Sequence, residues 1–232
     1  MKVKLKKLNT AILLYARMNS KRLPNKVLIK INSKTIISLI IDRIRKISKY
    51  KFPIIVCSSK ENSDNKLINY CVRKKIKFFR GSLNNVFDRT VECSNKYNFK
   101  SFVRVCADRP FFDVRLMDKM IKKFSENKYD IVTNQFPRTY PKGLACEIAR
   151  ISIFKNLNQN KIRISDKEHI FNFFYRNSKN YKIFNYFLNK NKIIKIKKQT
   201  NWSLNNKKDL LKIRKIYSSY SFNEYIDILK KT

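Results

Sequence analysis

The sequence contains few of the residues on which many phosphate and metal sites depend. Two glycines, Gly81 and Gly143, and one histidine occur among 232 residues. The chain has no Walker A loop, which needs glycines, and a single histidine argues against a structural zinc site. The five cysteines form no C-x-x-C pair and several lie inside apolar runs, so we expect reduced, buried thiols.

Long hydrophobic runs are also missing. No apolar run approaches the roughly 20 residues that span a bilayer, so no membrane span is predicted. The first apolar run, Ala11 to Tyr15, is shorter than the core of a signal peptide, which needs about 7 to 15 residues. We therefore expect a cytoplasmic protein.

Acidic residues are scarce: 16 Asp and Glu face 54 Lys and Arg, which gives a formal net charge of +38. Such a charge suits a nucleic-acid partner. The lysines are spread along a chain rich in Lys, Asn and Ile, however, and no aromatic-interleaved RNA-binding motif is present. Nucleic-acid binding is therefore a disfavoured rival interpretation, and any RNA or DNA contact is expected to be weak and salt-sensitive.

The length and the 43% hydrophobic content suit a single domain over residues 1–232. Buried strands alternate with amphipathic helices up to Thr133, which predicts a mostly parallel sheet with helices on both faces. The expected strands cover residues 11–15, 54–57, 77–79, 102–106 and 130–133, and the expected helices cover 35–48, 62–75, 86–97 and 114–127. A short extended segment is expected at 27–31. Beyond Asn134 we expect an edge strand at 144–149 and extended segments at 183–187 and 193–196. The helices expected there cover 151–157, 166–176, 207–217 and 222–229.

A cation-rich loop follows the first predicted strand. The stretch from Ala11 to Lys26 reads AILLYARMNSKRLPNK, an apolar run followed by four cations. Ligands of open α/β sheets bind beyond the carboxyl ends of the strands, and Arg and Lys both donate to phosphate oxygens. From this loop alone, a polyphosphate site and a solvated basic turn are equally good interpretations.

Asp108 follows another buried strand and lies in the same predicted layer as that loop. A carboxylate there suits Mg²⁺ beside nucleotide phosphates; the alternative is a turn-forming Asp close to Pro110. The single histidine, His169, lies near an expected helix start, where a structural or solvated role is commoner than a catalytic one. There is no Ser/His/Asp or Cys/His arrangement, and the Asp-x-Asp pair of metal-dependent nucleotide-sugar glycosyltransferases is missing.

Six segments of the chain, in sequence order, resemble the motifs of one known family. AILLYARMNSKRLPNKVL resembles Q-A-R-x-x-S-x-R-L-P-G-K-V-L, FFRGSLNNVFDR resembles F-R-G-S-x-x-D-V-L-x-R, and FVRVCADRPFFD resembles V-R-x-x-x-D-x-P-x-x-D. DIVTN, TYPKGLACEI and KEHI resemble D-Y-x-x-N, T-Y-P-x-G-L-x-x-E and R-E-H-V. These are motifs of the sugar cytidylyltransferases, which include the CMP-sialic-acid and CMP-Kdo synthetases, and the similarity is strongest to the spore-coat polysaccharide branch. It runs from Ala11 to His169, with a weaker echo near residues 201–217.

The resemblance implies a mostly parallel Rossmann-like sheet flanked by helices, of the nucleotide-diphospho-sugar transferase type. It implies transfer of a cytidylyl group from CTP, with Mg²⁺, to a sugar or sugar acid, for surface polysaccharide biosynthesis. A homodimer is compatible with the family, with residues 137–149 as a candidate contact region inside a sugar-site or dimerisation subregion of about 137–200. The implied catalytic residues are Arg17, Lys26 and Asp108; the implied nucleotide-binding residues are Arg17, Lys21, Arg22, Lys26, Arg80, Gly81 and Ser82; the implied substrate-binding residues are Tyr140, Glu147 and His169; the implied metal ligands are Asp108 and Asn205. Arg89 and Arg104 either orient acidic groups or pair with Asp88 and Asp113.

Three asparagines depart from the family pattern. Asn19 and Asn25 stand where the family has loop glycines, and asparagine tolerates left-handed backbone better than other non-glycine residues. Asn205 stands where related synthetases have a second metal-binding aspartate, so we expect weaker Mg²⁺ binding than a two-carboxylate site gives.

The departures leave rival interpretations open. One is a relative that binds CTP but has lost catalysis, and another keeps the enzyme but changes the nucleotide, because the loop cations recognise phosphates and not bases. The sugar is not specified by any of these residues.

Overall fold

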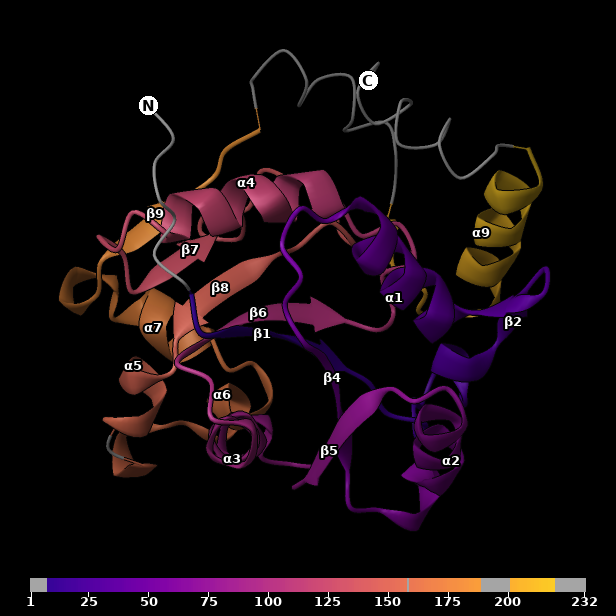
Figure 1. Cartoon of the computed structure of the whole chain (residues 1–232), viewed down its shortest axis with the longest axis horizontal. Coiled ribbons are helices and arrows are strands. Elements are labelled where there is room, and N and C mark those ends of the chain that lie inside the picture. Colours follow the sequence, from indigo (N-terminus) through magenta and orange to yellow (C-terminus); the bar gives the residue numbers. More distant parts are fainter. Residues whose placement is uncertain (1–7, 158, 189–200, 220–232) are drawn as a thin grey trace.

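The computed structural model describes residues 8–157, 159–188 and 201–219 (Figure 1). Within these residues, seven strands form one sheet in the order β5-β4-β1-β6-β8-β7-β9, and two short strands form a separate ribbon. The sheet contains β1 (Thr10–Tyr15), β4 (Ile54–Ser59), β5 (Lys77–Gly81), β6 (Ser101–Cys106), β7 (Ile131–Thr133), β8 (Glu147–Arg150) and β9 (Ile183–Asn185), and the ribbon pairs β2 (Lys30–Ile31) with β3 (Lys34–Thr35).

The central strand β1 is parallel to both of its neighbours, with Leu13 opposite Ile55 of β4 and Arg104 of β6. Nearly all residues of β1 and every residue of β4 are buried. Strands covered on both faces carry near-continuous apolar runs, which is the pattern these segments show in the sequence. The predicted mostly parallel sheet is therefore confirmed.

One strand runs against the others. The sequence predicts an edge strand at Leu144–Ala149, but β8 lies inside the sheet and is antiparallel to both β6 and β7. The prediction of an edge position is wrong, because β8 pairs with a strand on each side. Here Glu147 is buried, and Arg104 of β6 neutralises it.

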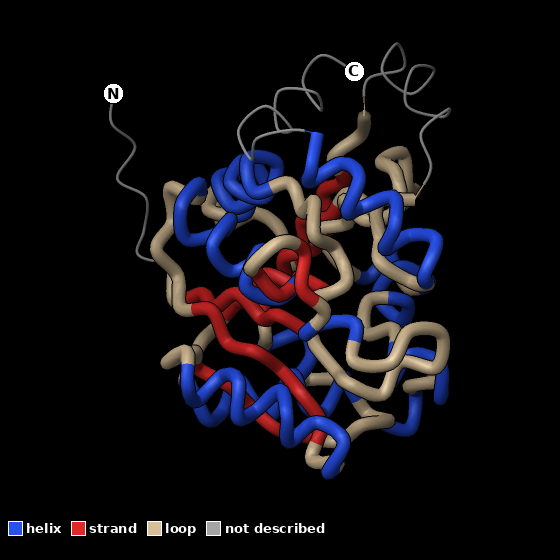
Figure 2. Tube along the Cα trace, turned by 90° about the vertical axis from the view of Figure 1, so that its right-hand side faces the viewer, coloured by secondary structure: helices blue, strands red, loops and turns tan. Residues whose placement is uncertain are grey.

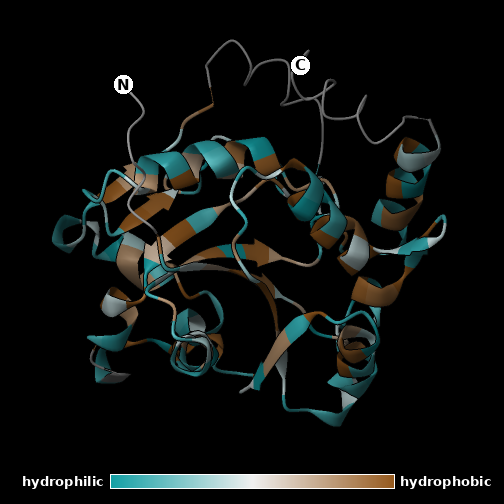
Figure 3. Cartoon of the chain, viewed as in Figure 1, coloured by the Kyte–Doolittle hydropathy of each residue, from teal (hydrophilic) through white to brown (hydrophobic). Residues whose placement is uncertain are grey.

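Helices cover both faces of the sheet, and each face has its own apolar core. Figure 2 shows helices on both sides of the strands, and Figure 3 shows hydrophobic residues concentrated along the central strands. Residues of α1 (Ile36–Ile47), α2 (Asn65–Arg73), α4 (Val114–Phe124) and α9 (Lys207–Ser219) pack in the core on one face. Residues of α3 (Val86–Tyr97), α5 (Ser152–Lys155) and α7 (Asn172–Arg176) pack in the core on the other face, where α6 (Ile164–Glu168) contacts α3.

Side-chain caps define where several helices begin. Thr35, Asn85 and Asp113 are the N-cap residues of α1, α3 and α4, and each accepts a hydrogen bond from the backbone N–H three residues later. Such caps satisfy backbone donors that have no partner inside the helix. The helix expected over 114–127 ends at Phe124, and Asn127 adopts a left-handed conformation, φ 62°, beyond that end.

Some predicted elements are shorter or divided. The helix expected at 62–75 begins as a 3-10 turn (Asn62–Asp64) and continues as α2, and the helix expected at 166–176 is divided into α6 and α7. The extended piece expected at 27–31 begins as a 3-10 turn (Lys26–Leu28) before β2. The segments predicted at 193–196 and 222–229 lie outside the described residues.

The topology brings three loops to one edge of the sheet. The backbone N–H of Ala16, just beyond β1, donates to Cys57 of β4 (3.1 Å), and the N–H of Ala107, just beyond β6, donates to Tyr15 (2.9 Å). The carboxyl ends of β1, β4 and β6 therefore meet, and this is where open α/β sheets bind ligands. Among the described helices, none is long and apolar enough to cross a membrane.

Candidate functional site

A cleft of about 620 Å³ opens at the carboxyl ends of β1 and β6. It is lined on one side by the cationic loop (residues 16–26), on another by the turn between β5 and α3, and on a third by the ends of β6 and α6 and by Asn205. The lining residues are Tyr15, Ala16, Arg17, Asn19, Ser20, Lys21, Arg22, Lys26, Val27, Leu83, Asn84, Val86, Arg89, Arg104, Cys106, Asp108, Glu168, His169 and Asn205. A concave site of this size with converging polar groups is the expected form of a small-molecule site.

A buried carboxylate holds the cationic loop in place. Asp64 is fully buried and accepts a hydrogen bond from the backbone N–H of Met18 (2.7 Å). Its other oxygen accepts from the hydroxyls of Ser58 and Ser59 and from the N–H of Ser59 (2.8 Å). Burial opposes the charge, but these hydrogen bonds outweigh it and lower the pKa of Asp64, so the carboxylate stays ionised.

The far end of the loop turns at Asn25, whose φ of 59° is left-handed. Its N–H donates to the carbonyl of Met18 (2.9 Å), and its carbonyl accepts from Leu28 (2.9 Å). Asparagine can adopt this conformation at little cost. Asn25 thus adopts the left-handed conformation for which asparagine is suited, whereas Asn19 is not among the positive-φ residues of the described chain.

Three loop cations reach across the cleft to groups on the opposite side. Lys26 donates to Asp108 Oδ2 (2.9 Å) and to the Leu204 carbonyl (3.2 Å). Arg22 donates to Asn205 Oδ1 (3.1 Å), and Arg17 pairs with Glu168 (3.2 Å) with both side chains about half exposed. An exposed pair of this kind contributes only about 0–1 kcal/mol, so Arg17 is available to an anionic ligand at little cost.

Asp108 and Asn205 lie next to each other although they are far apart in sequence. The N–H of Leu204 donates to the backbone carbonyl of Asp108 (2.8 Å), which places Asn205 beside the end of β6. Both side chains offer oxygen, the donor that Mg²⁺ prefers, and Mg²⁺ is often held by one or two carboxylates plus substrate phosphates. The donor type of the pair therefore suits Mg²⁺, and in this structure Lys26 donates to Asp108 Oδ2 and Arg22 donates to Asn205 Oδ1. The described residues contain no group of three His, Cys, Asp or Glu side chains that forms a metal cage by itself.

A buried network lies behind the cleft. Arg104 pairs with Glu147, and the Tyr175 hydroxyl donates to the same carboxylate (2.9 Å). Burial opposes the charge of Arg104, yet Cys106 and Glu147 raise its pKa above the ordinary value. Burial, followed by Glu147, raises the pKa of Tyr175. Arg104 thus stays charged and links the buried Glu147 to the cleft.

The structure brings together most of the predicted site residues. The sequence left open that Arg104 pairs with Asp88 or Asp113. In the structure Arg104 pairs with Glu147, and Asp113 is the N-cap residue of α4. The predicted residues that line the cleft are Arg17, Lys21, Arg22, Lys26, Asp108, His169 and Asn205.

Three predicted nucleotide-binding residues do not line the cleft: Arg80 and Gly81 bond to the loop that follows β4, and Ser82 bonds within the β5–α3 turn. Arg80 donates to the carbonyls of residues 59, 60 and 61 at 2.9–3.0 Å. The carbonyl of Gly81 accepts from Lys60 (2.9 Å), and Ser82 Oγ accepts from the N–H of Asn85 (3.0 Å). Their neighbours Leu83 and Asn84 line the cleft, and direct nucleotide contact by Arg80, Gly81 and Ser82 stays a prediction.

Two predicted sugar-side residues also lie away from the cleft surface. Glu147 pairs with Arg104, which lines the cleft, and the partly buried Tyr140 packs against the core. Sequence reasoning gave no definite role to Arg89 and Arg104, and it did not select Tyr15 or Glu168. The sequence does mark Arg104, because a cation inside an otherwise apolar strand needs a buried partner or a ligand.

Comparisons with known proteins agree with this geometry. A family model described as cytidylyltransferase matches residues 11–227. An uncharacterized protein of Methanocaldococcus jannaschii is 29% identical over 171 residues, which cover 74% of this chain and 69% of the relative. The spore coat polysaccharide biosynthesis protein SpsF of Bacillus subtilis is 26% identical over 152 residues, 63% of this chain and 61% of SpsF.

Two solved structures resemble the whole described fold. A cytidylyltransferase from Leptospira borgpetersenii superposes with a TM-score of 0.85 at 26% identity, covering 97% of this chain and 94% of that one. A CMP:2-keto-3-deoxy-manno-octonic acid synthetase complexed with CTP has a TM-score of 0.67 at 14% identity, covering 90% and 98%, and shares the fold. The family match extends over nearly all of the sequence, so this chain belongs to the cytidylyltransferase family and is a nucleotidyltransferase.

Proposed function

We propose that the protein transfers a cytidylyl group from CTP to a hydroxyl of a sugar or sugar acid. The hydroxyl oxygen bonds to the α-phosphorus, the bond from that phosphorus to the bridging oxygen breaks, and pyrophosphate leaves with the electron pair. The hydroxyl proton passes to solvent. One observation carries the proposal: four cations of one loop face Asp108 and Asn205 across a single cleft.

The chain's own contribution is to position the triphosphate and to neutralise its charge. Arg17, Lys21, Arg22 and Lys26 together bring four positive charges to the cleft. Phosphoryl-type transfer requires little covalent work from a protein, so positioning and electrostatic stabilisation account for most of the catalysis. Lys26 is held by Asp108 and by the Leu204 carbonyl, which orients its ammonium group before a substrate arrives.

Asp108 and Asn205 would hold Mg²⁺ beside the phosphates. The ion, when bound, neutralises phosphate charge and polarises the phosphoryl oxygens. Asn205 offers an oxygen without a charge, so we propose weaker Mg²⁺ binding than two carboxylates would give.

The acceptor sugar is proposed to bind at the His169 side of the cleft, with Glu147 acting behind it through Arg104. Tyr140 stays a further candidate for sugar contact. The similarity to SpsF, which is named for spore coat polysaccharide biosynthesis, supports a role for the product in surface polysaccharide synthesis.

The test is pyrophosphate release from CTP with a panel of sugars and sugar acids, comparing the wild type with Lys26→Met and with Lys96→Met. Lys96 lies exposed on α3 and is the matched control. We expect release with at least one acceptor, little or none from Lys26→Met, and wild-type release from the control. Equal release from both variants would contradict the role of the cationic loop.

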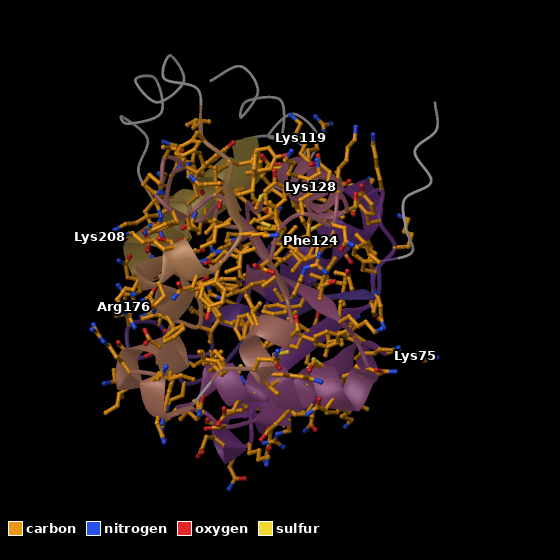
Figure 4. The ribbon with its side chains drawn as sticks, turned by 90° about the vertical axis from the view of Figure 1, so that its left-hand side faces the viewer. Lys75, Lys119, Phe124, Lys128, Arg176 and Lys208 are labelled. Atoms are coloured by element: carbon orange, nitrogen blue, oxygen red, sulfur yellow. The ribbon has the colours of Figure 1, made fainter. Side chains whose placement is uncertain are left out.

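A second candidate is a relative that binds CTP without transferring it, and the amide of Asn205 in place of a carboxylate favours it. Such a protein would bind CTP and release no pyrophosphate with any acceptor. Nucleic-acid binding is less well supported, because the lysines are spread along the whole sequence. In Figure 4 the labelled Lys75 and Lys208 lie on different sides of the molecule, apart from Lys119 and Lys128.

A further inference from the structure

Arg89 is a buried cation, and two of its nitrogen atoms have no hydrogen-bond partner among the residues that the structure describes. It lies in the first turns of α3 and is only 4% exposed, yet it lines the cleft. Its Nε and Nη1 atoms are buried and have no hydrogen-bond partner among the described residues. Buried polar groups in native proteins are nearly always paired, and a buried charge without a partner is costly. The burial of the Arg89 guanidinium without partners for these two atoms is therefore unfavourable in the absence of a ligand.

No carboxylate in the described part of the chain forms an ion pair with Arg89. Asp64 contributes a favourable charge, but its oxygens already accept four hydrogen bonds. Burial lowers the pKa of Arg89, and the neighbouring Arg17 lowers it further. The centroid of the Tyr15 ring lies 5.9 Å from the guanidinium carbon, a contact that favours a cation without satisfying its N–H donors.

The local structure is nevertheless built to keep Arg89 in this place. A Cβ added at Gly81 would lie 2.6 Å from Arg89 Cγ, so the glycine makes room for the arginine side chain. Arg104 approaches the same Tyr15 ring at 5.9 Å and also lines the cleft. Two guanidinium groups thus flank one aromatic ring at the cleft wall. Within the described ranges, Arg104 pairs with the carboxylate of Glu147 and Arg89 pairs with none.

We infer that Arg89 is an anion receptor of the cleft, separate from the cationic loop, and that its Nε and Nη1 donate to two oxygens of a bound substrate. A guanidinium fork matches the paired oxygens of a phosphate or a carboxylate. The inference rests on the proposed function, because the two substrates offer both sources: the phosphates of CTP and the carboxylate of a sugar acid.

Calorimetry and unfolding measurements on wild type, Arg89→Met, Arg89→Lys and Lys96→Met test this role. Inorganic pyrophosphate, CTP and cytidine probe the phosphate source, and D-glucuronate with D-glucose probes the carboxylate source. We expect Arg89→Met to weaken binding of one anion by about tenfold or more, with cytidine and glucose binding unchanged. Arg89→Lys keeps the charge but not the fork and should recover only part of that affinity, while Lys96→Met should bind as the wild type does.

The pattern of loss identifies the source. Weaker binding of pyrophosphate and CTP assigns Arg89 to the nucleotide, and loss of glucuronate binding alone assigns it to the acceptor. The ligand-free Arg89→Met protein should be at least as stable as the wild type, because removing an unpaired buried charge relieves its desolvation. A large loss of stability in both Arg89 variants, with anion binding by Arg89→Lys at the wild-type level, would show a structural residue and overturn the inference.

The proposed function and this inference fail separately. If the wild type releases pyrophosphate from CTP and the Arg89 variants bind every anion as tightly as the wild type does, only the inference about Arg89 is overturned. A wild type that releases none with any acceptor, but binds inorganic pyrophosphate in an Arg89-dependent way, overturns the transfer activity alone.

Discussion

Replacing Asp64 with alanine should both destabilise the protein and weaken CTP binding. Asp64 is fully buried and anchors the cationic loop through the N–H of Met18. The substitution leaves the N–H groups of Met18 and Ser59 buried without that acceptor, while the two serine hydroxyls can rotate toward other partners. Each orphaned amide costs about 1–3 kcal/mol, so we expect the free energy of unfolding to fall by about 2–6 kcal/mol.

The weaker CTP binding expected for Asp64→Ala follows from the loss of order in the cationic loop. Met18 lies directly beside Arg17, and a loop released from Asp64 must be ordered again when a triphosphate binds. We expect the Kd for CTP to rise by about tenfold, the equivalent of 1.4 kcal/mol. Urea unfolding measures the loss in the free energy of unfolding, and calorimetry measures the Kd for CTP. Both experiments start at a temperature at which the variant is folded in the absence of urea.

The matched control is Asp42→Ala. Asp42 is also an aspartate that pairs with a neighbour, Lys34 at 2.6 Å, but the pair is about half exposed. We expect a loss of at most about 1 kcal/mol and unchanged CTP binding. If Asp64→Ala behaves like this control, the idea that a buried carboxylate organises the cationic loop is refuted.

Three further predictions concern the metal pair, the 143 turn and acid stability. Asn205→Asp should strengthen the Mg²⁺ dependence of CTP binding, and an unchanged Mg²⁺ titration would rule out a metal role for this position. Gly143→Ala should lower the free energy of unfolding by about 2–4 kcal/mol, because φ is +97° and the new Cβ would lie 2.5 Å from the Trp202 backbone; stability equal to that of the wild type in denaturant would contradict this. Arg176 holds the pKa of Asp166 below its ordinary value, so this pair stabilises the folded state above about pH 4. That stability should be lost as the pH falls through the lowered pKa, and Asp166→Asn should flatten the acid branch of a stability–pH curve.

The parallel half of the fold is predictable from the sequence because its signals are local. The runs at Ala11–Tyr15 and Ile54–Cys57 are apolar enough to indicate strands buried on both faces. The helix expected at 86–97 has the same bounds as α3, since Asn85 provides a recognisable cap.

The antiparallel half depends on contacts between distant residues. The interior position of β8 follows from the pairing of Glu147 with Arg104, 43 residues apart in sequence. The division between α6 and α7 occurs at residues 169–171, where the sequence carries no proline or glycine to indicate a break.

The site divides in the same way. The cationic loop and Asp108 follow predicted strands, so the rule for carboxyl ends of strands brings them together. The proximity of Asn205 could be expected only from the family resemblance, because the backbone hydrogen bond between Leu204 and Asp108 joins residues 96 apart in sequence. The burial of Arg89 follows from its packing against Gly81 and Tyr15, and no sequence pattern reveals that its donors lack partners.

Selective nucleotide binding tests the central claim most directly, since a turnover assay with the wrong acceptor gives a misleading negative. Calorimetric titrations with CTP, UTP, ATP and GTP, each with and without Mg²⁺, measure how the affinity depends on the base and on the metal ion. We predict selective binding of CTP that Mg²⁺ strengthens. Equal binding of all four nucleotides, or none, would contradict the assignment of the cleft as a CTP site.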